Sequence, residues 1–131
     1  MRKYILIIED DLPTIDVYKT LFENGGFRIE VLSYKEAVME KLASLERPAA
    51  KKPDLVILDI ILPDINGIDI LTEIRRGKRT KDLPVFLLTN YTDREMEKMG
   101  KKLKAEKFLL KTDYTPTKLL DLISKRLKVK K

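Results

Sequence analysis

Five short apolar runs, each followed by a longer segment with apolar residues at helical spacing, constrain the fold of this chain more than any other feature. The runs lie at residues 4–8, 27–32, 55–58, 85–88 and 107–110. Runs this short are typical of buried strands, and one predicted helix separates each from the next. Such strands are obliged to run parallel, with right-handed crossovers. The sequence therefore predicts an α/β domain with a doubly wound five-stranded parallel sheet and helices on both faces.

The segments between the runs carry signals for the ends of the helices. Ser33, with Glu36 three residues later, forms a capping-box pattern that predicts the start of a helix, which Pro48 closes. A further helix is capped by Thr92 or Asp93 and runs to about residue 102. The remaining helices are expected at residues 13–24, 67–75 and 115–127.

Three aspartates beside the predicted elements have ordinary structural interpretations. We expect Asp11 to cap the first helix or to stay solvated. Asp54 and Asp64 each follow a proline, a pattern typical of turns. None of the three is assigned to chemistry.

The composition excludes several kinds of chemistry. The chain has no cysteine and no histidine among its 131 residues. It therefore offers no disulfide, no thiolate metal site, no Cys nucleophile and no imidazole base. Asp, Glu, Lys, Ser and Thr remain to carry any reaction.

Length and hydropathy indicate one domain. We expect residues 1–127 to form it and residues 128–131 to be a short basic tail. The apolar runs are far shorter than the roughly 20 residues that a membrane helix needs. The N-terminus enters a strand within three residues, without the pattern of a signal peptide. We therefore expect a cytoplasmic protein with no membrane insertion.

The net charge of +6 raises the question of an acidic partner or nucleic acid. Basic residues are spread over residues 75–81, 98–107 and 125–131, mostly mixed with acids. This distribution favours an ordinary solvated surface, and no nucleic-acid-binding motif is present. We do not expect direct DNA binding.

Reactive side chains follow four of the five predicted strands. They are Glu9 and Asp10 after the first, Asp59 after the third, Thr89 after the fourth and Lys111 after the fifth. The carboxyl ends of parallel strands meet at one edge of the sheet. Three carboxylates gathered there repel one another, and an all-oxygen cluster suits Mg²⁺. A lysine and a hydroxyl opposite it suit the oxygens of a phosphoryl group, which leaves Asp59 as the carboxylate nucleophile.

These motifs resemble the receiver domain of bacterial two-component response regulators. The resemblance spans nearly the whole chain and rests on several motifs in the family's order. Pro63 and Gly67 stand four and eight residues after Asp59, as in the family. The motifs that carry it are residues 5–11, 53–67, 88–89 and 108–111. The resemblance implies the flavodoxin-like receiver fold.

The resemblance also implies a role for each acid of the cluster. Asp59 would accept a phosphoryl group from a phosphohistidine on a histidine kinase or histidine phosphotransfer protein, or from a small phosphodonor. Asp10, Asp59 and the backbone carbonyl of Ile61 would bind Mg²⁺ directly, and Glu9 would act mainly through water. The chain would then be a signalling switch that catalyses its own phosphotransfer and slow dephosphorylation, not a classical enzyme.

In the family, the switch residues follow the fourth strand and lie on the fifth. Lys111 would pair with the phosphoryl oxygens, and Thr89 would move inward to bond one of them. Phe108 matches the aromatic switch position, whose ring turns inward when Thr89 moves. The output would be a reshaped surface around the fourth and fifth helices, which an unknown downstream protein contacts. The sequence leaves open whether the chain forms a homodimer.

The sequence departs from the family at three positions. Thr112 follows Lys111 where the family usually has a proline, often after a cis peptide bond. A cis bond before a non-proline residue costs about 3 kcal/mol, so the geometry of the loop that holds Lys111 is left open. Asn90 replaces a smaller residue after Thr89, and Lys104 replaces a common glycine before Ala105. We expect these changes to slow phosphotransfer without abolishing it.

Two bulky residues predict a long-lived phosphorylated state. Ile61 and Tyr91 occupy the positions two after Asp59 and two after Thr89. In the family these positions flank the route of the hydrolytic water. We therefore expect slow self-dephosphorylation.

Three other functions remain as alternatives. Thr112 and Asn90 leave open a degenerate receiver that binds a partner without phosphorylation, although the full acidic, hydroxyl and lysine set argues against it. A flavodoxin-like cofactor carrier needs a phosphate-cradling first loop, which the acids at residues 9–11 would oppose. A haloacid-dehalogenase-type hydrolase needs a second Asp where Ile61 stands.

Overall fold

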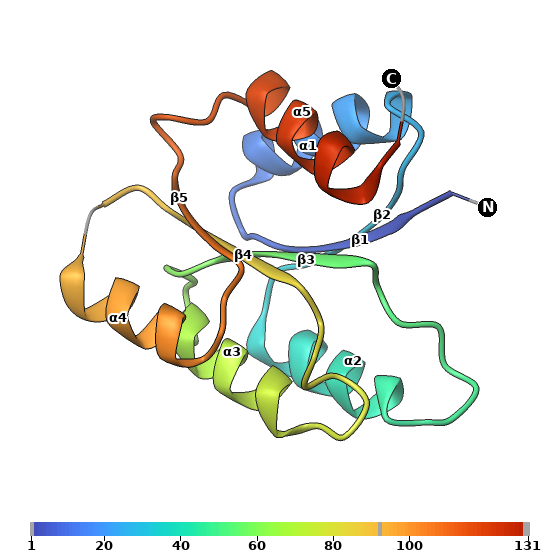
Figure 1. Cartoon of the computed structure of the whole chain (residues 1–131), viewed down its shortest axis with the longest axis vertical. Coiled ribbons are helices and arrows are strands. Elements are labelled where there is room, and N and C mark those ends of the chain that lie inside the picture. Colours follow the sequence, from blue (N-terminus) through green and yellow to red (C-terminus); the bar gives the residue numbers. More distant parts are fainter. Residues whose placement is uncertain (1, 92, 130–131) are drawn as a thin grey trace.

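The computed structural model describes residues 2–91 and 93–129, and it shows one parallel sheet of five strands with helices on both faces (Figure 1). The strands are β1 Tyr4–Ile8, β2 Arg28–Leu32, β3 Leu55–Asp59, β4 Val85–Thr89 and β5 Lys107–Leu110. The helices are α1 Leu12–Asn24, α2 Lys35–Leu45, α3 Gly67–Arg76, α4 Arg94–Lys102 and α5 Pro116–Leu127. The sheet order is β2-β1-β3-β4-β5, so the predicted doubly wound fold is confirmed.

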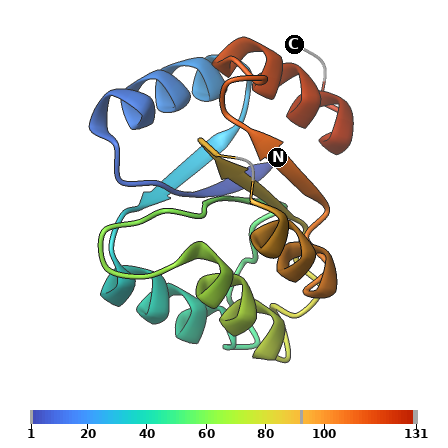
Figure 2. The same ribbon diagram turned by 90° about the vertical axis from the view of Figure 1, so that its left-hand side faces the viewer.

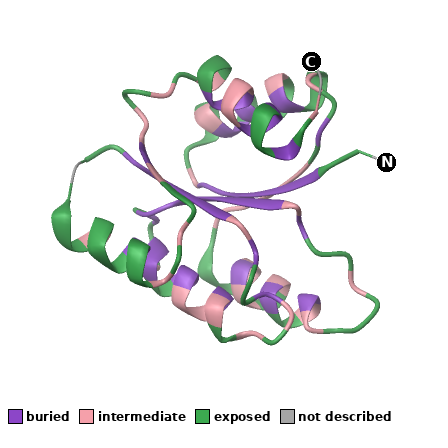
Figure 3. Cartoon of the chain, viewed as in Figure 1, coloured by how far each residue is buried: buried purple, intermediate pink, exposed green. Residues whose placement is uncertain are grey.

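The sheet separates two hydrophobic layers. Helices α1 and α5 cover one face, and α2, α3 and α4 cover the other (Figures 1 and 2). Strands β1, β3 and β4 are buried along their whole length, as the middle of Figure 3 shows. Alternate residues of a strand face opposite sides, so Ile57 packs with the α1 and α5 layer while Val56 and Leu58 pack with the other.

The register of the sheet brings the predicted reactive residues to one edge. Ile8 pairs with Leu58 of β3, and Asp59 pairs with Leu88 of β4. Thr89 then pairs with Leu110, the residue before Lys111. Three strands therefore deliver an acid, a hydroxyl and a lysine within neighbouring loops.

The predicted capping box at Ser33 is wrong. Helix α2 begins at Lys35 after Tyr34, and the Ser33 hydroxyl instead donates to the backbone carbonyl of Glu9 at 2.8 Å. The carboxylate of Asp64 accepts from the Lys35 amide at 3.0 Å and caps the helix from a distant loop. Tertiary contact with the acidic loop has therefore overridden the local pattern.

The other aspartates have the structural roles expected of them, with one addition. Asp11 caps α1 by accepting from the Thr14 amide, and Asp93 caps α4. The expected alternative cap, Thr92, lies outside the described residues. Asp54 lies in the bend before β3, where its carboxylate also accepts from the Tyr4 amide at 2.8 Å and ties the starts of β1 and β3 together.

Within the described residues, no helix combines the length and the apolar character that crossing a membrane requires.

Candidate functional site

A cavity of about 420 Å³ opens at the carboxyl edge of the sheet, between the loops that follow β1, β3, β4 and β5. It contains most of the residues that the sequence singled out. Its lining is Glu9, Asp10, Asp11, Thr14, Asp59, Ile61, Asn90, Tyr91 and Lys111. Thr14, on α1, carried no sequence signal, because it reaches the cavity only through the path of the helix after its cap.

Glu9 is held rigidly at the end of β1. It is only 2% exposed, and its Oε1 atom lies 2.6 Å from Lys111 Nζ. Its Oε2 atom accepts from the backbone amides of Asp10 at 3.0 Å and Asp11 at 3.2 Å. Both carboxylate oxygens therefore have donors, which makes Glu9 an anchor for Lys111.

Asp59 is a nearly buried carboxylate at the end of β3, with 7% of its surface exposed. Its Oδ2 atom lies 3.1 Å from Lys111 Nζ, and its Oδ1 atom accepts from the Ile61 amide at 3.1 Å. Burial, followed by the charge of Glu9, raises the pKa of Asp59 to about 6, although Lys111 acts in the opposite direction. One lysine therefore does not neutralise the two acids, and the site has room for a further cation.

Gly67 explains why the loop after Asp59 can fold back against it. A Cβ atom at this position would lie 2.6 Å from the Asp59 carbonyl oxygen and from the Ile60 Cα atom. No residue with a side chain fits so close to a backbone. The glycine eight residues after Asp59 is thus required by the approach of α3 to the end of β3.

Lys111 reaches the site despite the unusual residue after it. Its amide donates to the Thr89 carbonyl at 2.8 Å, which continues the pairing of β4 with β5. The described part of the chain has no cis peptide bond, and the loop instead closes when the Asp113 amide donates to the Leu110 carbonyl at 3.0 Å. Burial lowers the pKa of Lys111, but its contacts with Glu9 and Asp59 outweigh burial and raise it. Thr112 therefore does not displace the lysine.

Carboxylate oxygens of Glu9, Asp10 and Asp59 lie within 4.8 Å of one another. This spacing lets one small ion meet ligands from two strands. Oxygen donors alone suit Mg²⁺ or a similar hard cation. The residues present therefore fit the magnesium site expected from the sequence.

Thr89 and Phe108 lie on the same face of the sheet, on adjacent strands. Thr89 is 3% exposed, and its hydroxyl oxygen accepts from the Tyr91 amide at 3.3 Å. Phe108 pairs with Leu87, two residues before Thr89, and its half-buried ring packs against the α2, α3 and α4 layer. The Phe108 ring lies beside α4, because a Cβ atom at Gly100 of that helix would come 3.7 Å from Phe108 Cδ2.

Ile61 and Tyr91 stand at the rim of the cavity. They are 55% and 66% exposed, so neither belongs to the core. Asn90 lines the same cavity between β4 and α4. Lys104 lies elsewhere, in the loop before β5 at the opposite edge of the sheet, with a left-handed φ of 59°. Glycine adopts that conformation without cost, so the replacement of glycine by Lys104 affects the backbone of this loop and not the reacting groups.

Comparison with known proteins identifies the family. Residues 5–124 match the family described as response regulator receiver domain. This chain belongs to that family. The receiver is 31% identical over 121 residues to the phosphate regulon transcriptional regulatory protein PhoB of Escherichia coli, which covers 92% of this chain and 49% of PhoB. It is 29% identical to the alkaline phosphatase synthesis transcriptional regulatory protein PhoP of Bacillus subtilis, covering 85% of this chain and 43% of PhoP.

Solved structures give the same result for the fold. The receiver superposes on a CheY-like response regulator receiver domain protein from Methanospirillum hungatei with a TM-score of 0.80 and 26% identity, covering 98% and 95% of the two chains. It also superposes on the Mn²⁺-bound form of response regulator Rcp1, with a TM-score of 0.79, 23% identity and coverage of 93% and 91%. The chain spans about half the length of the curated relatives it matches. The family assignment displaces the flavodoxin-like carrier and the haloacid-dehalogenase-type hydrolase.

Proposed function

We propose that this receiver is a phosphorylation-dependent switch in which Asp59 accepts a phosphoryl group from a histidine kinase or a histidine phosphotransfer protein. The observation that carries the proposal is the position of Asp59 on the wall of an open cavity, with Lys111 Nζ 3.1 Å from one carboxylate oxygen. A nucleophile and a cation for the transferred group then lie side by side.

In the proposed step, a carboxylate oxygen of Asp59 attacks phosphorus. The new P–O bond forms as the P–N bond of the phosphohistidine breaks, and the imidazole leaves with the electron pair. Lys111 is already held by Glu9 and is positioned to pair with oxygens of the transferred group. The Thr89 hydroxyl accepts from the Tyr91 amide and keeps its own hydrogen, which it would donate to one of these oxygens after moving inward.

Asp10, Asp59 and the backbone carbonyl of Ile61 would hold Mg²⁺, with Glu9 acting mainly through water. When bound, the ion would neutralise charge on the transferring phosphoryl group. The engagement of both Glu9 oxygens by other donors supports its indirect role. The Mn²⁺-bound form of Rcp1 shows that a receiver of the same fold can hold a divalent cation.

Acetyl phosphate with Mg²⁺, followed by intact-mass measurement, tests this function. We expect an added mass of one phosphoryl group in the wild type and none in Asp59→Asn. Asp16→Asn is the matched control, since Asp16 is an exposed residue of α1 outside the cavity. If no adduct forms in the wild type although Mg²⁺ binds, the alternative of a phosphorylation-independent binding module stands in place of the proposal.

The rim of the cavity supports a long lifetime for the aspartyl phosphate. Ile61 and Tyr91 place large side chains at the mouth through which a hydrolytic water would enter. We expect Ile61→Asn combined with Tyr91→Glu to accelerate loss of the phosphoryl group, measured by phosphate release after removal of donor. An unchanged rate contradicts this role for the rim.

The output in this proposal is a protein contact near α4. Thr89 and Phe108 lie on the face that α4 covers, so their movement would change the surface of that helix. Residues 1–127 would form the switch, with a basic tail at 128–131, in the cytoplasm where kinase and Mg²⁺ are available. Direct DNA binding is not part of the proposal, and homodimer formation is left to sedimentation measurements.

A further inference from the structure

Two loops at the amino end of the sheet are joined into one surface. Residues 46–54 lead into β3 and residues 77–84 lead into β4, both from the end of the sheet where β1 begins (Figure 1). The Arg79 guanidinium, on the second loop, donates to the carbonyl of Leu45 at 3.0 Å and to that of Ala50 at 3.1 Å. The backbone of the first loop is therefore fixed against the second.

The exposed side chains of this joined surface include a group of basic residues. No ion pair joins any of them to a carboxylate within residues 2–91 and 93–129. Residues from two separate loops thus present their charge together, which the spacing of basic residues along the sequence does not reveal. We call the group the amino-end patch, and its members are Arg47, Lys51, Lys52, Lys78 and Lys81.

The acids of the two loops do not neutralise this patch. The two carboxylate oxygens of Glu46 accept from the Arg79 amide at 3.1 and 3.3 Å, and Asp54 accepts from the Tyr4 amide at 2.8 Å. Both acids are half-buried and directed at backbone amides. Asp82 is the one exposed acid of the two loops, every residue of which the structure describes. The amino-end patch therefore keeps an excess of positive charge.

The patch offers positive charge without an apolar or aromatic anchor. A protein partner is typically held by such anchors, and single-stranded nucleic acid stacks its bases on aromatic side chains. RNA is recognised through unpaired bases or its 2′-hydroxyl groups. Lysine and arginine alone suit the closely spaced phosphates of duplex DNA. The exposed large hydrophobic residues of the described chain lie outside the two loops, at Leu12, Val17, Tyr34, Ile61, Tyr91 and Met99.

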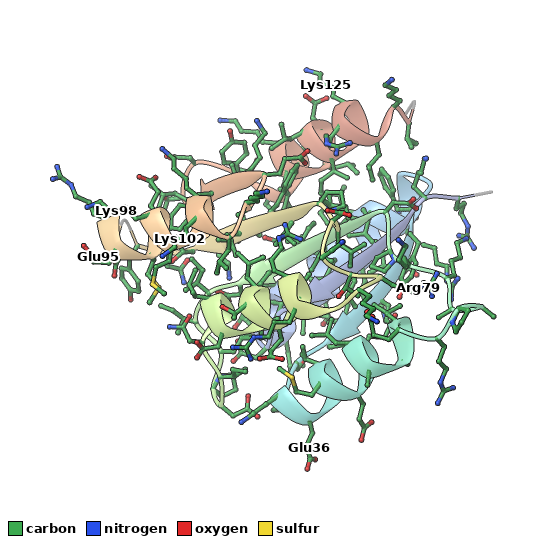
Figure 4. All side chains as sticks on the ribbon, turned by 60° about the horizontal axis from the view of Figure 1, so that its bottom comes forward. Glu36, Arg79, Glu95, Lys98, Lys102 and Lys125 are labelled. Atoms are coloured by element: carbon green, nitrogen blue, oxygen red, sulfur yellow. The ribbon has the colours of Figure 1, made fainter. Side chains whose placement is uncertain are left out.

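We infer that the amino-end patch binds the phosphate backbone of double-stranded DNA without reading its sequence. Basic residues that are scattered along the chain predicted no direct DNA binding, but the fold gathers five of them on one surface. This surface lies at the end of the sheet opposite Asp59, and Figure 4 shows Arg79 far from Lys98 of α4. Bound DNA therefore leaves the cavity and α4 uncovered, and its binding requires no phosphoryl group.

Fluorescence anisotropy of a labelled DNA duplex of about two helical turns measures this binding to the full chain. Between about 50 and 200 mM salt, the logarithm of the dissociation constant should rise with the logarithm of salt with a slope of about 3 to 4, because each neutralised phosphate contributes about 0.9. Duplexes of unrelated sequence should bind equally well. A single strand of the same length, an RNA duplex and vesicles containing anionic lipid should bind more weakly.

Lys51→Gln combined with Lys78→Gln removes one charge from each loop. The salt slope should fall by about 2, and the dissociation constant at about 50 mM salt should rise about tenfold. Lys19→Gln combined with Lys98→Gln is the matched control, because it changes the net charge equally at exposed residues of α1 and α4. The control should bind within about twofold of the wild type. Thermal unfolding should be alike in all three proteins, since every replaced side chain is exposed.

Four results overturn the inference. They are no binding of the DNA duplex by the wild type at the lowest salt, equal weakening by the two double variants, an unchanged salt slope in the patch variant, and binding of the single strand, the RNA duplex or the vesicles as tight as that of the DNA duplex.

Discussion

At the amino end of the sheet, two arginines donate to backbone carbonyls of the loops, whereas at the carboxyl end two acids share one lysine. Arg75 donates to four carbonyls at 2.7–3.0 Å. Arg79, labelled in Figure 4, donates to the carbonyls of Leu45 and Ala50. Glu9 and Asp59 instead share Lys111.

The amino end of the sheet contributes to stability, whereas the carboxyl end holds the groups for chemistry. At the amino end, the guanidinium groups of Arg75 and Arg79 give hydrogen-bond donors to backbone carbonyls of the surrounding loops. The carboxyl end keeps a carboxyl group whose pKa is raised to about 6, which is an electrostatic cost that ligand binding can offset. We therefore expect the loss of a hydrogen-bonding side chain at the amino end to lower stability, and the loss of the Asp59 charge at the carboxyl end to raise it.

Arg75→Ala should have the largest effect. It leaves the carbonyls of Leu103, Lys81, Leu83 and Lys104 without their donor and should lower the free energy of unfolding by roughly 3 kcal/mol. Urea unfolding measures this, with Arg76→Ala as the control. Arg76 is exposed and pairs with Glu73 at the surface, so its loss should cost under about 0.5 kcal/mol. Equal effects of the two variants would refute the special role of Arg75.

Asp59→Asn should stabilise the metal-free protein by about 2 kcal/mol at pH 8. A pKa raised from 3.8 to about 6 means that the folded state holds its proton more tightly than the unfolded state. Wild-type stability therefore falls as the pH rises from about 4 to 6, and the advantage of Asn grows over the same range. Unfolding in EDTA at several pH values measures it, and a gain that does not vary with pH would count against electrostatic strain at Asp59.

Tyr4→Phe tests the amino end at a smaller scale. The Tyr4 hydroxyl donates to Glu30, which also lies 2.8 Å from Lys41. Because Tyr4 is buried, losing this bond should cost about 1 kcal/mol. Tyr34→Phe, at a residue 62% exposed, should leave the unfolding midpoint unchanged.

Lys104→Gly should have the smallest effect and raise stability by roughly 0.5–1 kcal/mol. Lys104 has a φ of 59°, which costs any residue with a Cβ atom, and glycine removes that cost. Lys104→Ala separates this cause from loss of the side chain, because it keeps the Cβ atom. A gain in the alanine variant as large as in the glycine variant would exclude backbone strain as the cause.

The sequence predicted the carboxyl end better than the amino end. Apolar runs ending in acids locate Glu9 and Asp59, because strand periodicity and parallel topology determine which residues meet. Arg75 and Arg79 gave no signal, since their partners are carbonyls, which every residue has. The prediction of a capping box at Ser33 failed because the Ser33 hydroxyl donates to the carbonyl of Glu9, 24 residues away, and a local pattern does not reveal such a distant partner. The sequence marked Lys104 only as a position where the family commonly has glycine. Its left-handed φ of 59° explains why glycine suits this position.

Chemical trapping of the phosphorylated residue tests the central claim most directly. The wild type is treated with acetyl phosphate and Mg²⁺, then reduced with borohydride, which converts an aspartyl phosphate into homoserine, and digested for peptide mass mapping. We predict homoserine at position 59 and nowhere else. Homoserine at Asp10 or another carboxylate, or unmodified Asp59 throughout, would contradict the assignment of Asp59 as the phosphoacceptor.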